Sequence, residues 1–226
     1  IKTSEKMRSE FIANASHELK TPLTAIKGFN DIIGLQTNEQ ETRALSEKID
    51  KEVTRIIALL KDMLDLSELE SQKDVNPEDV SLAQIAESVK ESLAPVAAEK
   101  NVKISVDGDA IVRMEKEHAI ELVKNLVENG VKYNRNGGYV KVTISSDASH
   151  TTLTVADDGI GIEDKHQQRI FERFYRVNKS RSRETGGTGL GLAIVKHVCT
   201  LYNADLSLTS KLGVGTTVMV AFRRNL

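Results

Sequence analysis

The sequence is poor in cysteine, proline and tryptophan, and it lacks a long apolar run. Its 226 residues include one cysteine, three prolines and no tryptophan. A single cysteine excludes an internal disulfide framework and fits a reducing compartment. No stretch reaches the roughly 18 apolar residues that a membrane-spanning helix needs, and no signal peptide opens the chain. Because the first residue is Ile1 rather than methionine, we expect a soluble piece of a longer protein.

An excess of charge of one sign is also missing. The chain has 31 lysines and arginines against 33 acidic residues, a formal net charge of −2. A protein that binds nucleic acid over a whole face is usually far more basic, so the composition argues against that class. Hydrophobic residues make up 39% of the chain, which is enough for a packed core and argues against long-range disorder.

The first third of the chain has the apolar spacing of helices. Residues 12–33 contain a heptad seam with steps of three and four, which is apolar except at Ser16 and Asn30, and residues 45–63 contain a second apolar run of this kind. Gly34 and the polar residues 36–40 predict a turn between the two helices. Because one pair of helices cannot cover both apolar stripes, we expect two hairpins to form a four-helix bundle in a homodimer.

The pattern changes after a polar segment that contains Pro77. We expect a domain of residues 1–72, a linker of residues 73–80 and a second domain of residues 81–226. The second domain is predicted to form helices at 82–99, 116–134 and 189–202, and strands at 102–106, 139–145, 153–156, 206–209 and 216–222. This order predicts an α+β sandwich, with helices on one face of a mainly antiparallel sheet.

The first candidate for chemistry is the segment that begins at His17 on the first long helix. His17 follows a seam position, so we expect its ring at the bundle surface, with Glu18 beside it and Thr21 one turn later. Pro22 cannot donate to the carbonyl of Glu18, which predicts a kink. The acid can hydrogen-bond one ring nitrogen and leave the other free for nucleophilic attack. Taken alone, the pair also fits an exposed histidine with a chance acidic neighbour.

A second candidate lies on the helix predicted at 116–134. Asn125 and Asn129 are four residues apart on one face, and Lys132 follows. Amide oxygens and a lysine suit Mg²⁺ and a triphosphate, because both need hard oxygen ligands and positive charge. A polar helix face is the alternative explanation.

Two glycine-containing segments, residues 156–162 and 185–192, are further candidates. In the first, one acid of the pair Asp157 and Asp158 can accept from an adenine amino group, while two glycines let the backbone approach the base. In the second, successive amides ahead of a helix can bind phosphate oxygens. The second segment lacks the ending of a Walker A loop, and no βαβ unit surrounds it. Ordinary turns remain the alternative for both.

An aromatic and basic segment, residues 170–184, lies between these glycine segments. Such a composition can contact nucleic acid. Glutamates interrupt its five cations, however, and a mobile lid over a nucleotide fits better. Arg176 is then the candidate phosphate contact.

Taken in order, these motifs resemble the cytoplasmic core of a two-component sensor histidine kinase, over nearly the whole chain. The matching segments are the H-box at 17–22, the N-box at 125–134, the first glycine box at 157–161, the F-box at 171–175 and the second glycine box at 187–192. The resemblance implies that the first domain is a dimerisation and histidine-phosphotransfer domain. It implies that the second is an ATP-binding domain of the gyrase and MutL type.

The resemblance also implies roles for single residues. ATP is expected to bind with Mg²⁺ held by Asn129, and its γ-phosphoryl group is expected to pass to His17, with Glu18 as hydrogen-bond acceptor or base. The next acceptor is an aspartate of a response-regulator receiver domain, and Thr21 orients the water that dephosphorylates the regulator. Arg176 lies near the phosphates. The other nucleotide contacts that the resemblance implies are Asn125, Lys132, Tyr133, Asp157, Gly159, Gly161, Ile162, Gly187, Thr188, Gly189, Leu190, Gly191 and Leu192.

Two positions depart from the family pattern. Asp158 stands where asparagine is most usual, and Gly130 stands where alanine is common. The added negative charge of Asp158 is expected to weaken ATP binding modestly. Two other functions remain open: an ATPase of the gyrase or MutL kind, and a dimeric adaptor without catalysis. The resemblance further implies that the chain is the cytoplasmic portion of a membrane-anchored parent. The charge balance indicates that nucleic acid is not a partner.

Overall fold

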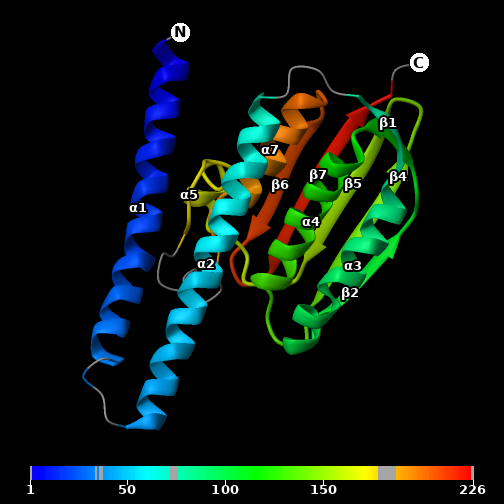
Figure 1. The fold of residues 1–226 in the computed structure, drawn as a ribbon. Helices are drawn as coiled ribbons and strands as arrows, with labels where there is room; N and C mark the ends of the chain where they lie inside the picture. The colour runs from blue at the N-terminus through cyan, green and yellow to red at the C-terminus, as the bar shows by residue number, and fades with distance from the viewer. Residues whose placement is uncertain (1, 34, 36–37, 72–75, 178–186, 225–226) are drawn as a thin grey trace. The chain divides into compact units, whose positions relative to one another are not determined.

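A computed structural model describes residues 2–33, 35, 38–71, 76–177 and 187–224 (Figure 1). For residues 2–14, 16, 17 and 71 it describes the backbone alone. The chain forms two compact units, one of the helical residues up to Asp65 and one of most of the chain from Leu66 on. Among the helices described, none has the length and the apolar character to cross a membrane.

The first unit contains the predicted helical hairpin. Helix α1 spans Lys2–Ile33, and helix α2 spans Glu39–Ser71. Helix α1 continues past Pro22, and the kink expected there stays a prediction. The side chain of Asn38 accepts the amide hydrogen of Gln40 at 3.0 Å and so caps α2. The last two residues of the predicted turn therefore belong to α2, and residues 34, 36 and 37 lie outside the described part of the chain.

One face of α2 exposes a stripe of large apolar side chains. The exposed fractions are 39% for Val53, 62% for Ile57, 45% for Leu60 and 64% for Leu64. These residues follow one another at intervals of four, three and four, so they lie on one side of the helix. Single exposed apolar residues are common, but a continuous stripe is typical of an interaction surface.

The second unit is built on a five-stranded sheet with the strand order β2-β4-β5-β7-β6. The strands are β2 (Lys103–Asp107), β4 (Tyr139–Ser146), β5 (His150–Asp157), β6 (Asp205–Lys211) and β7 (Gly215–Arg223). Strand β2 is parallel to β4, and the other neighbours are antiparallel, which confirms the predicted mainly antiparallel sheet. Asp157, the last residue of β5, pairs with Val140 and Thr216 on either side.

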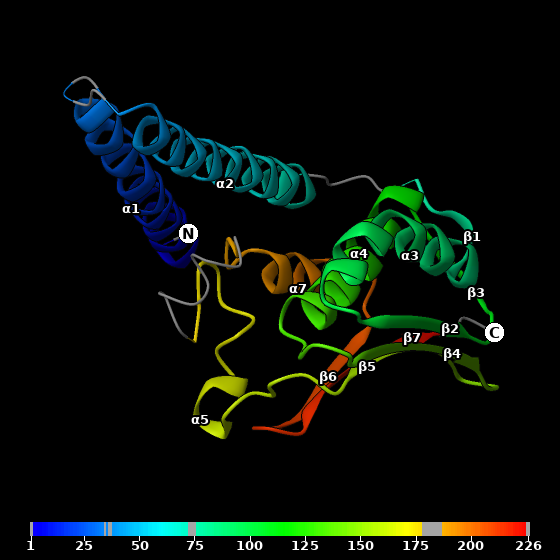
Figure 2. The same ribbon diagram turned by 90° about the horizontal axis from the view of Figure 1, so that it is seen from below.

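Three helices cover one face of this sheet (Figure 2). They are α3 (Leu82–Glu99), α4 (Lys116–Lys132) and α7 (Gly191–Leu201), and α4 packs against both of the others. Leu122 of α4, Leu153 of β5 and Ile194 of α7 are fully buried in the core between these layers. The predicted α+β sandwich is therefore confirmed.

Three short elements of the second unit were not predicted. Strand β1 (Glu78–Ser81) pairs antiparallel with β3 (Ile111–Met114), and helix α5 spans Asp164–Gln167. Four residues are too few for a clear period in the sequence. Because β1 includes residues 78–80, the end of the predicted linker is a strand, and residues 72–75 lie outside the described part. The hydroxyl of Ser81 then accepts the amide hydrogen of Gln84 at 3.2 Å and caps α3.

Candidate functional site

Asn125 lies on α4 beside the first residue of α7. Its amide nitrogen donates to the backbone oxygen of Glu121 at 2.8 Å and to the carboxylate of Glu121 at 3.2 Å. A Cβ atom at Gly191 would lie only 2.5 Å from the side-chain oxygen of Asn125. The fold thus brings the N-box against the start of α7, where backbone amides and the helix dipole favour an anion.

The end of α4 contacts the first glycine box. Tyr133 follows α4, and its backbone oxygen accepts the amide hydrogen of Ile160 at 3.1 Å. A Cβ atom at Gly159 would lie 2.5 Å from that same oxygen. Gly161 has a φ of +66°, a conformation that residues with side chains rarely adopt. These glycines let the turn after β5 lie close to α4.

Asp157 begins this turn with a half-buried carboxyl group. The carboxylate accepts the amide hydrogen of Gly159 at 2.8 Å. Burial raises the pKa of Asp157 to about 6, although hydrogen bonds from the backbone of Gly159 and Thr216 act in the opposite direction. Above that pH, the group is an ionised acceptor in a fixed position.

Asp158, which departs from the family pattern, is engaged with the backbone. Its carboxylate accepts the amide hydrogen of Tyr139 at 2.7 Å, at the first residue of β4. The side chain therefore ties the first glycine box to the neighbouring strand. The expected weakening of ATP binding by Asp158 stays a prediction.

The F-box and the second glycine box meet through the backbone. The amide of Phe174 donates to the carbonyl of Gly189 at 2.9 Å, and both residues have a positive φ, +60° and +77°. A Cβ atom at Gly189 would lie 3.2 Å from Cγ of Arg176, so the half-buried Arg176 lies against this glycine. The rest of the predicted lid, residues 178–184, lies outside the described residues.

The remaining predicted contacts lie on or beside the same elements. Asn129 is half-buried on α4, and its backbone oxygen accepts the amide hydrogen of Tyr133 at 3.0 Å. The others are the half-buried Lys132, Ile162, Thr188 and Leu192 and the buried Gly187 and Leu190. Within the described ranges, no three His, Cys, Asp or Glu side chains are grouped to hold a metal ion. An ion here would need amide and phosphate oxygens, the ligands that Mg²⁺ accepts.

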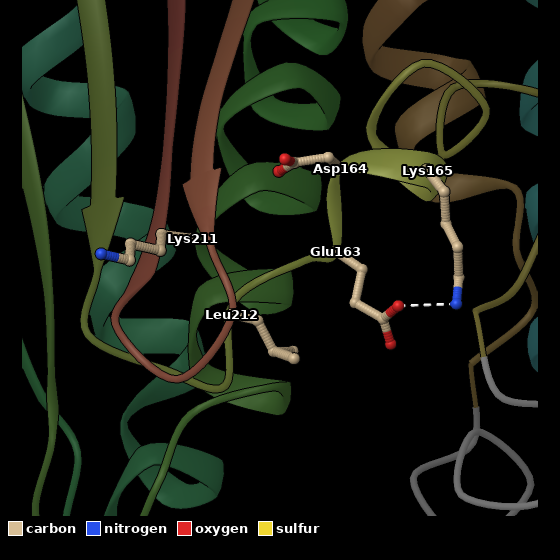
Figure 3. A pocket seen from close by; sticks show the side chains of 5 residues that line it. All are labelled: Glu163, Asp164, Lys165, Lys211 and Leu212. Atoms are coloured by element: carbon tan, nitrogen blue, oxygen red, sulfur yellow. Dashed lines mark ion pairs between the residues drawn. The ribbon is translucent and has the colours of Figure 1, made fainter.

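A shallow pocket of about 450 Å³ lies next to the first glycine box (Figure 3). Its lining residues are Glu163, Asp164, Lys165, Lys211 and Leu212. Glu163 and Lys165 form an ion pair at 2.6 Å within it. The amide of the preceding Ile162 donates to the hydroxyl of Ser210 at 2.9 Å. No predicted nucleotide contact lines this pocket.

The phospho-acceptor segment lies on α1 in the first unit. The side chain of His17 is outside the described part of the structure, while Glu18 and Thr21 are half-buried. A guanidinium nitrogen of Arg55 on α2 lies 3.1 Å from the carboxylate of Glu18, and these side chains are 9% and 16% exposed. Arg55 was not predicted, because a lone arginine among many helix charges gives no signal in the sequence. Only the hairpin brings it to Glu18.

Two family models match the chain in the order that the motifs predict. Residues 7–72 match the His Kinase A (phospho-acceptor) domain, and residues 114–226 match the histidine kinase-, DNA gyrase B-, and HSP90-like ATPase. The chain therefore belongs to the histidine kinases of this ATPase family, as the core of a two-component sensor histidine kinase.

Known proteins agree with this assignment. The phosphate regulon sensor protein PhoR of Pseudomonas aeruginosa is 39% identical over 227 residues, which cover 96% of this chain and 50% of PhoR. The chain spans about half the length of the curated relatives it matches.

Two solved structures share the fold. The histidine kinase ThkA in complex with response regulator protein TrrA has a TM-score of 0.78 at 17% identity, over 99% of this chain and 64% of that one. Full-length ShkA in complex with AMPPNP has a TM-score of 0.67 at 23% identity, over 94% of this chain and 45% of that one.

Proposed function

We propose that this chain catalyses ATP-dependent phosphorylation of its own His17 and then transfers the phosphoryl group to an aspartate of a response-regulator receiver domain. The observation that carries the proposal is that the N-box, the F-box and the two glycine boxes contact one another around α4 and α7. The contacts are those of Asn125 with Gly191, Tyr133 with Ile160, and Phe174 with Gly189. A plain ATPase of the same family would need no acceptor histidine, and an adaptor would need no nucleotide site.

In this proposal, the second unit binds the nucleotide through the turn after β5 and the start of α7. The Asp157 carboxylate accepts a hydrogen from the adenine amino group, and Gly159 and Gly161 allow the backbone to approach the base. The amides that precede α7 bind phosphate oxygens. Lys132 and Arg176 supply positive charge near the phosphates.

The residues present fit a magnesium ion. Asn129 offers an amide oxygen, and Asn125, which approaches Gly191, supports it from one turn earlier. When bound, Mg²⁺ neutralises charge on the phosphates. The protein contributes to this site by holding Asn129 in a fixed position on helix α4.

Phosphoryl transfer then joins a ring nitrogen of His17 to the γ-phosphorus while the bond from that phosphorus to the ADP oxygen breaks. The proton on the ring leaves to Glu18, and ADP is the leaving group. The contact with Arg55 supports this role, because it fixes one oxygen of the Glu18 carboxylate. The product is a phosphoramidate, which donates onward to the regulator.

We also infer a homodimer, in which the exposed stripe from Val53 to Leu64 on α2 is covered by a second copy. The structure of ThkA with TrrA supports a receiver domain as the partner by likeness of fold. Membership of this family supports a cytoplasmic placement as part of a membrane-anchored sensor. The proposed domains are the histidine-phosphotransfer hairpin of residues 1–72 and the ATP-binding domain of residues 81–226, joined by residues 73–80.

The acceptor is tested by incubating the full chain with γ-labelled ATP and Mg²⁺. We expect acid-labile, alkali-stable label in the wild type and none in His17→Gln. His150→Gln is the matched control, because His150 lies on β5 in the second unit and carries no role in the proposal. Wild-type labelling of His17→Gln would overturn the proposal.

A second activity, dephosphorylation of the regulator, is assigned to Thr21. One turn after His17, its hydroxyl can orient a water molecule. Thr21→Ala is expected to slow dephosphorylation of a phosphorylated receiver domain about hundredfold, because the attacking water is no longer oriented, and to keep autophosphorylation. Loss of both activities in a folded variant would contradict this role.

A further inference from the structure

Arg135 donates hydrogen bonds to backbone oxygens of two separate turns. Its Nε atom lies 2.5 Å from the carbonyl oxygen of Asp158, and its Nη2 atom lies 3.3 Å from that of Gly159. The same Nη2 atom lies 3.3 Å from the carbonyl oxygen of Gly213 and 3.4 Å from that of Val214. One guanidinium thus joins the turn after β5 to the turn between β6 and β7.

Hydrogen bonds of the neighbouring Asn134 also hold the backbone of Arg135 in place. Asn134, which is only 9% exposed, accepts the amide hydrogen of Arg135 at 2.8 Å. The amide nitrogen of Asn134 donates to the backbone oxygen of Tyr139 at 2.9 Å. Because Arg135 follows the end of α4 closely, the guanidinium links three segments: the end of α4 and the two turns.

The two turns also contact each other directly. The amide of Gly213 donates to the carbonyl of Ile160 at 2.7 Å. The guanidinium of Arg135 adds charge-assisted hydrogen bonds to this contact, at carbonyl oxygens of both turns. Its position on the surface means that the buried core between sheet and helices does not depend on it.

We propose that Arg135 is a positioning residue for nucleotide binding, which holds the turn of Asp157 and Gly159 in the conformation that receives the adenine base. The inference rests on the proposed function, because it takes the first glycine box to be the base site. Arg135 acts through backbone carbonyls of this turn and is not itself assigned a contact with the nucleotide. No sequence motif marks it.

The test compares Arg135→Ala and Arg135→Lys with Arg113→Ala, a control on the exposed side of β3. Binding of AMPPNP to the full chain is measured by calorimetry, and KM and kcat for ATP are measured by label incorporation. We expect Arg135→Ala to raise Kd and KM about tenfold, the effect of losing charge-assisted hydrogen bonds. We expect kcat at saturating ATP to change less than about twofold. Arg135→Lys should recover part of the affinity, and Arg113→Ala should match the wild type.

An unchanged Kd in folded Arg135→Ala would overturn the inference. A lower kcat together with a lower melting temperature and an unchanged KM would also overturn the inference, because that result indicates a general structural role. If Arg135→Ala does not fold, the AMPPNP affinity of Arg135→Lys is the test. Wild-type affinity in Arg135→Lys would contradict the inference, because a lysine cannot reproduce the planar arrangement of donors that reaches several carbonyl oxygens. AMPPNP binding without label in the wild type would contradict the proposed kinase function and leave the binding test of Arg135 intact.

Discussion

Asp157 is the residue at which folding and nucleotide recognition make opposite demands. Burial favours its neutral form and raises its pKa from 3.8 to about 6, whereas recognition of an amino group needs the ionised form. A raised pKa means that the folded chain binds this proton more tightly than the unfolded chain. The resulting stabilisation is fully present below pH 3.8 and is lost as the pH rises through about 6.

We therefore predict that Asp157→Asn removes the part of the stability loss with rising pH that comes from ionisation of Asp157. The free energy of unfolding, followed by urea titration, should fall between about pH 4 and 6 in the wild type and less in the variant. Tyrosine fluorescence reports on the second unit, because all four tyrosines lie between residues 133 and 202. AMPPNP affinity of the wild type should fall on acidification through the same range.

Asp158→Asn is the matched control for this prediction. It leaves the Asp157 carboxyl group in place and is expected to keep both pH dependences, with a slightly lower midpoint, because the charge of Asp158 contributes a little to the raised pKa of Asp157. If Asp157→Asn retained the wild-type dependence of stability on pH, the ionisation assigned to Asp157 would be wrong.

Residues that belong to recognisable nucleotide-site motifs could be found from the sequence. Residues that hold those motifs in place through hydrogen bonds or ion pairs could not. Asn125, Asp157 and Gly191 belong to motifs whose spacing and composition indicate a nucleotide site. Arg55 and Arg135 carry common charges in polar surroundings, and their partners lie 37 and 23 to 79 residues away. Only the folded hairpin and sheet bring those partners together, so no local pattern could predict them.

At the scale of elements, the contact between α4 and α7 depends on the absence of a side chain at Gly191. We predict that Gly191→Ala weakens AMPPNP binding about tenfold, which is a loss of about 1.4 kcal/mol. The new Cβ would overlap the Asn125 side chain, which can rotate away, so affinity should fall more than stability. Calorimetry and thermal unfolding measure the two effects.

Gly28→Ala is the control substitution for Gly191→Ala. Gly28 lies in α1, and beyond the adjoining residues and the local helix backbone no described heavy atom lies within 4 Å of a Cβ built there. We expect no change in AMPPNP affinity and a gain of about 1 kcal/mol in helix stability. An equal loss of affinity in both variants would contradict the close approach at Gly191.

The exposed stripe of α2 is the element that we assign to dimerisation. Leu60→Glu would place a charge in the helix interface, at a cost of several kcal/mol, and should weaken the dimer at least about hundredfold. Val96→Glu is the matched control, since Val96 and Leu60 are each 45% exposed and Val96 lies on α3. Sedimentation equilibrium gives both association constants. A dimer that survives Leu60→Glu unchanged would place the interface elsewhere.

Long periodic elements could be predicted well, and short ones could not. The predicted helix at 82–99 has the bounds of α3, and the five strands of the main sheet lie at the expected positions. Strands β1 and β3 were missed, because each has four residues and draws its stability from the other across 29 intervening positions or more. Such pairing is a tertiary property that local spacing does not encode.

At the scale of the whole molecule, the proposal assigns the two reactants to different units. His17 and Glu18 belong to the helical unit, and the nucleotide motifs belong to the unit built on the sheet, except for Gly187 and Thr188, which are grouped with the helical unit. Transfer then requires that the γ-phosphoryl group meet the histidine ring, and a substitution in either unit should stop labelling. Asn129→Asp is expected to abolish labelling of an intact His17.

The most direct measurement is the position of the phosphoryl group on the full chain after incubation with ATP and Mg²⁺. Peptide mass spectrometry at alkaline pH, where a phosphoramidate survives, can locate it. We predict a phosphoryl group on His17 and on no other residue, and none on Asn129→Asp. A phosphoryl group on another residue, or an unmodified His17 in a chain that binds AMPPNP, would contradict the account.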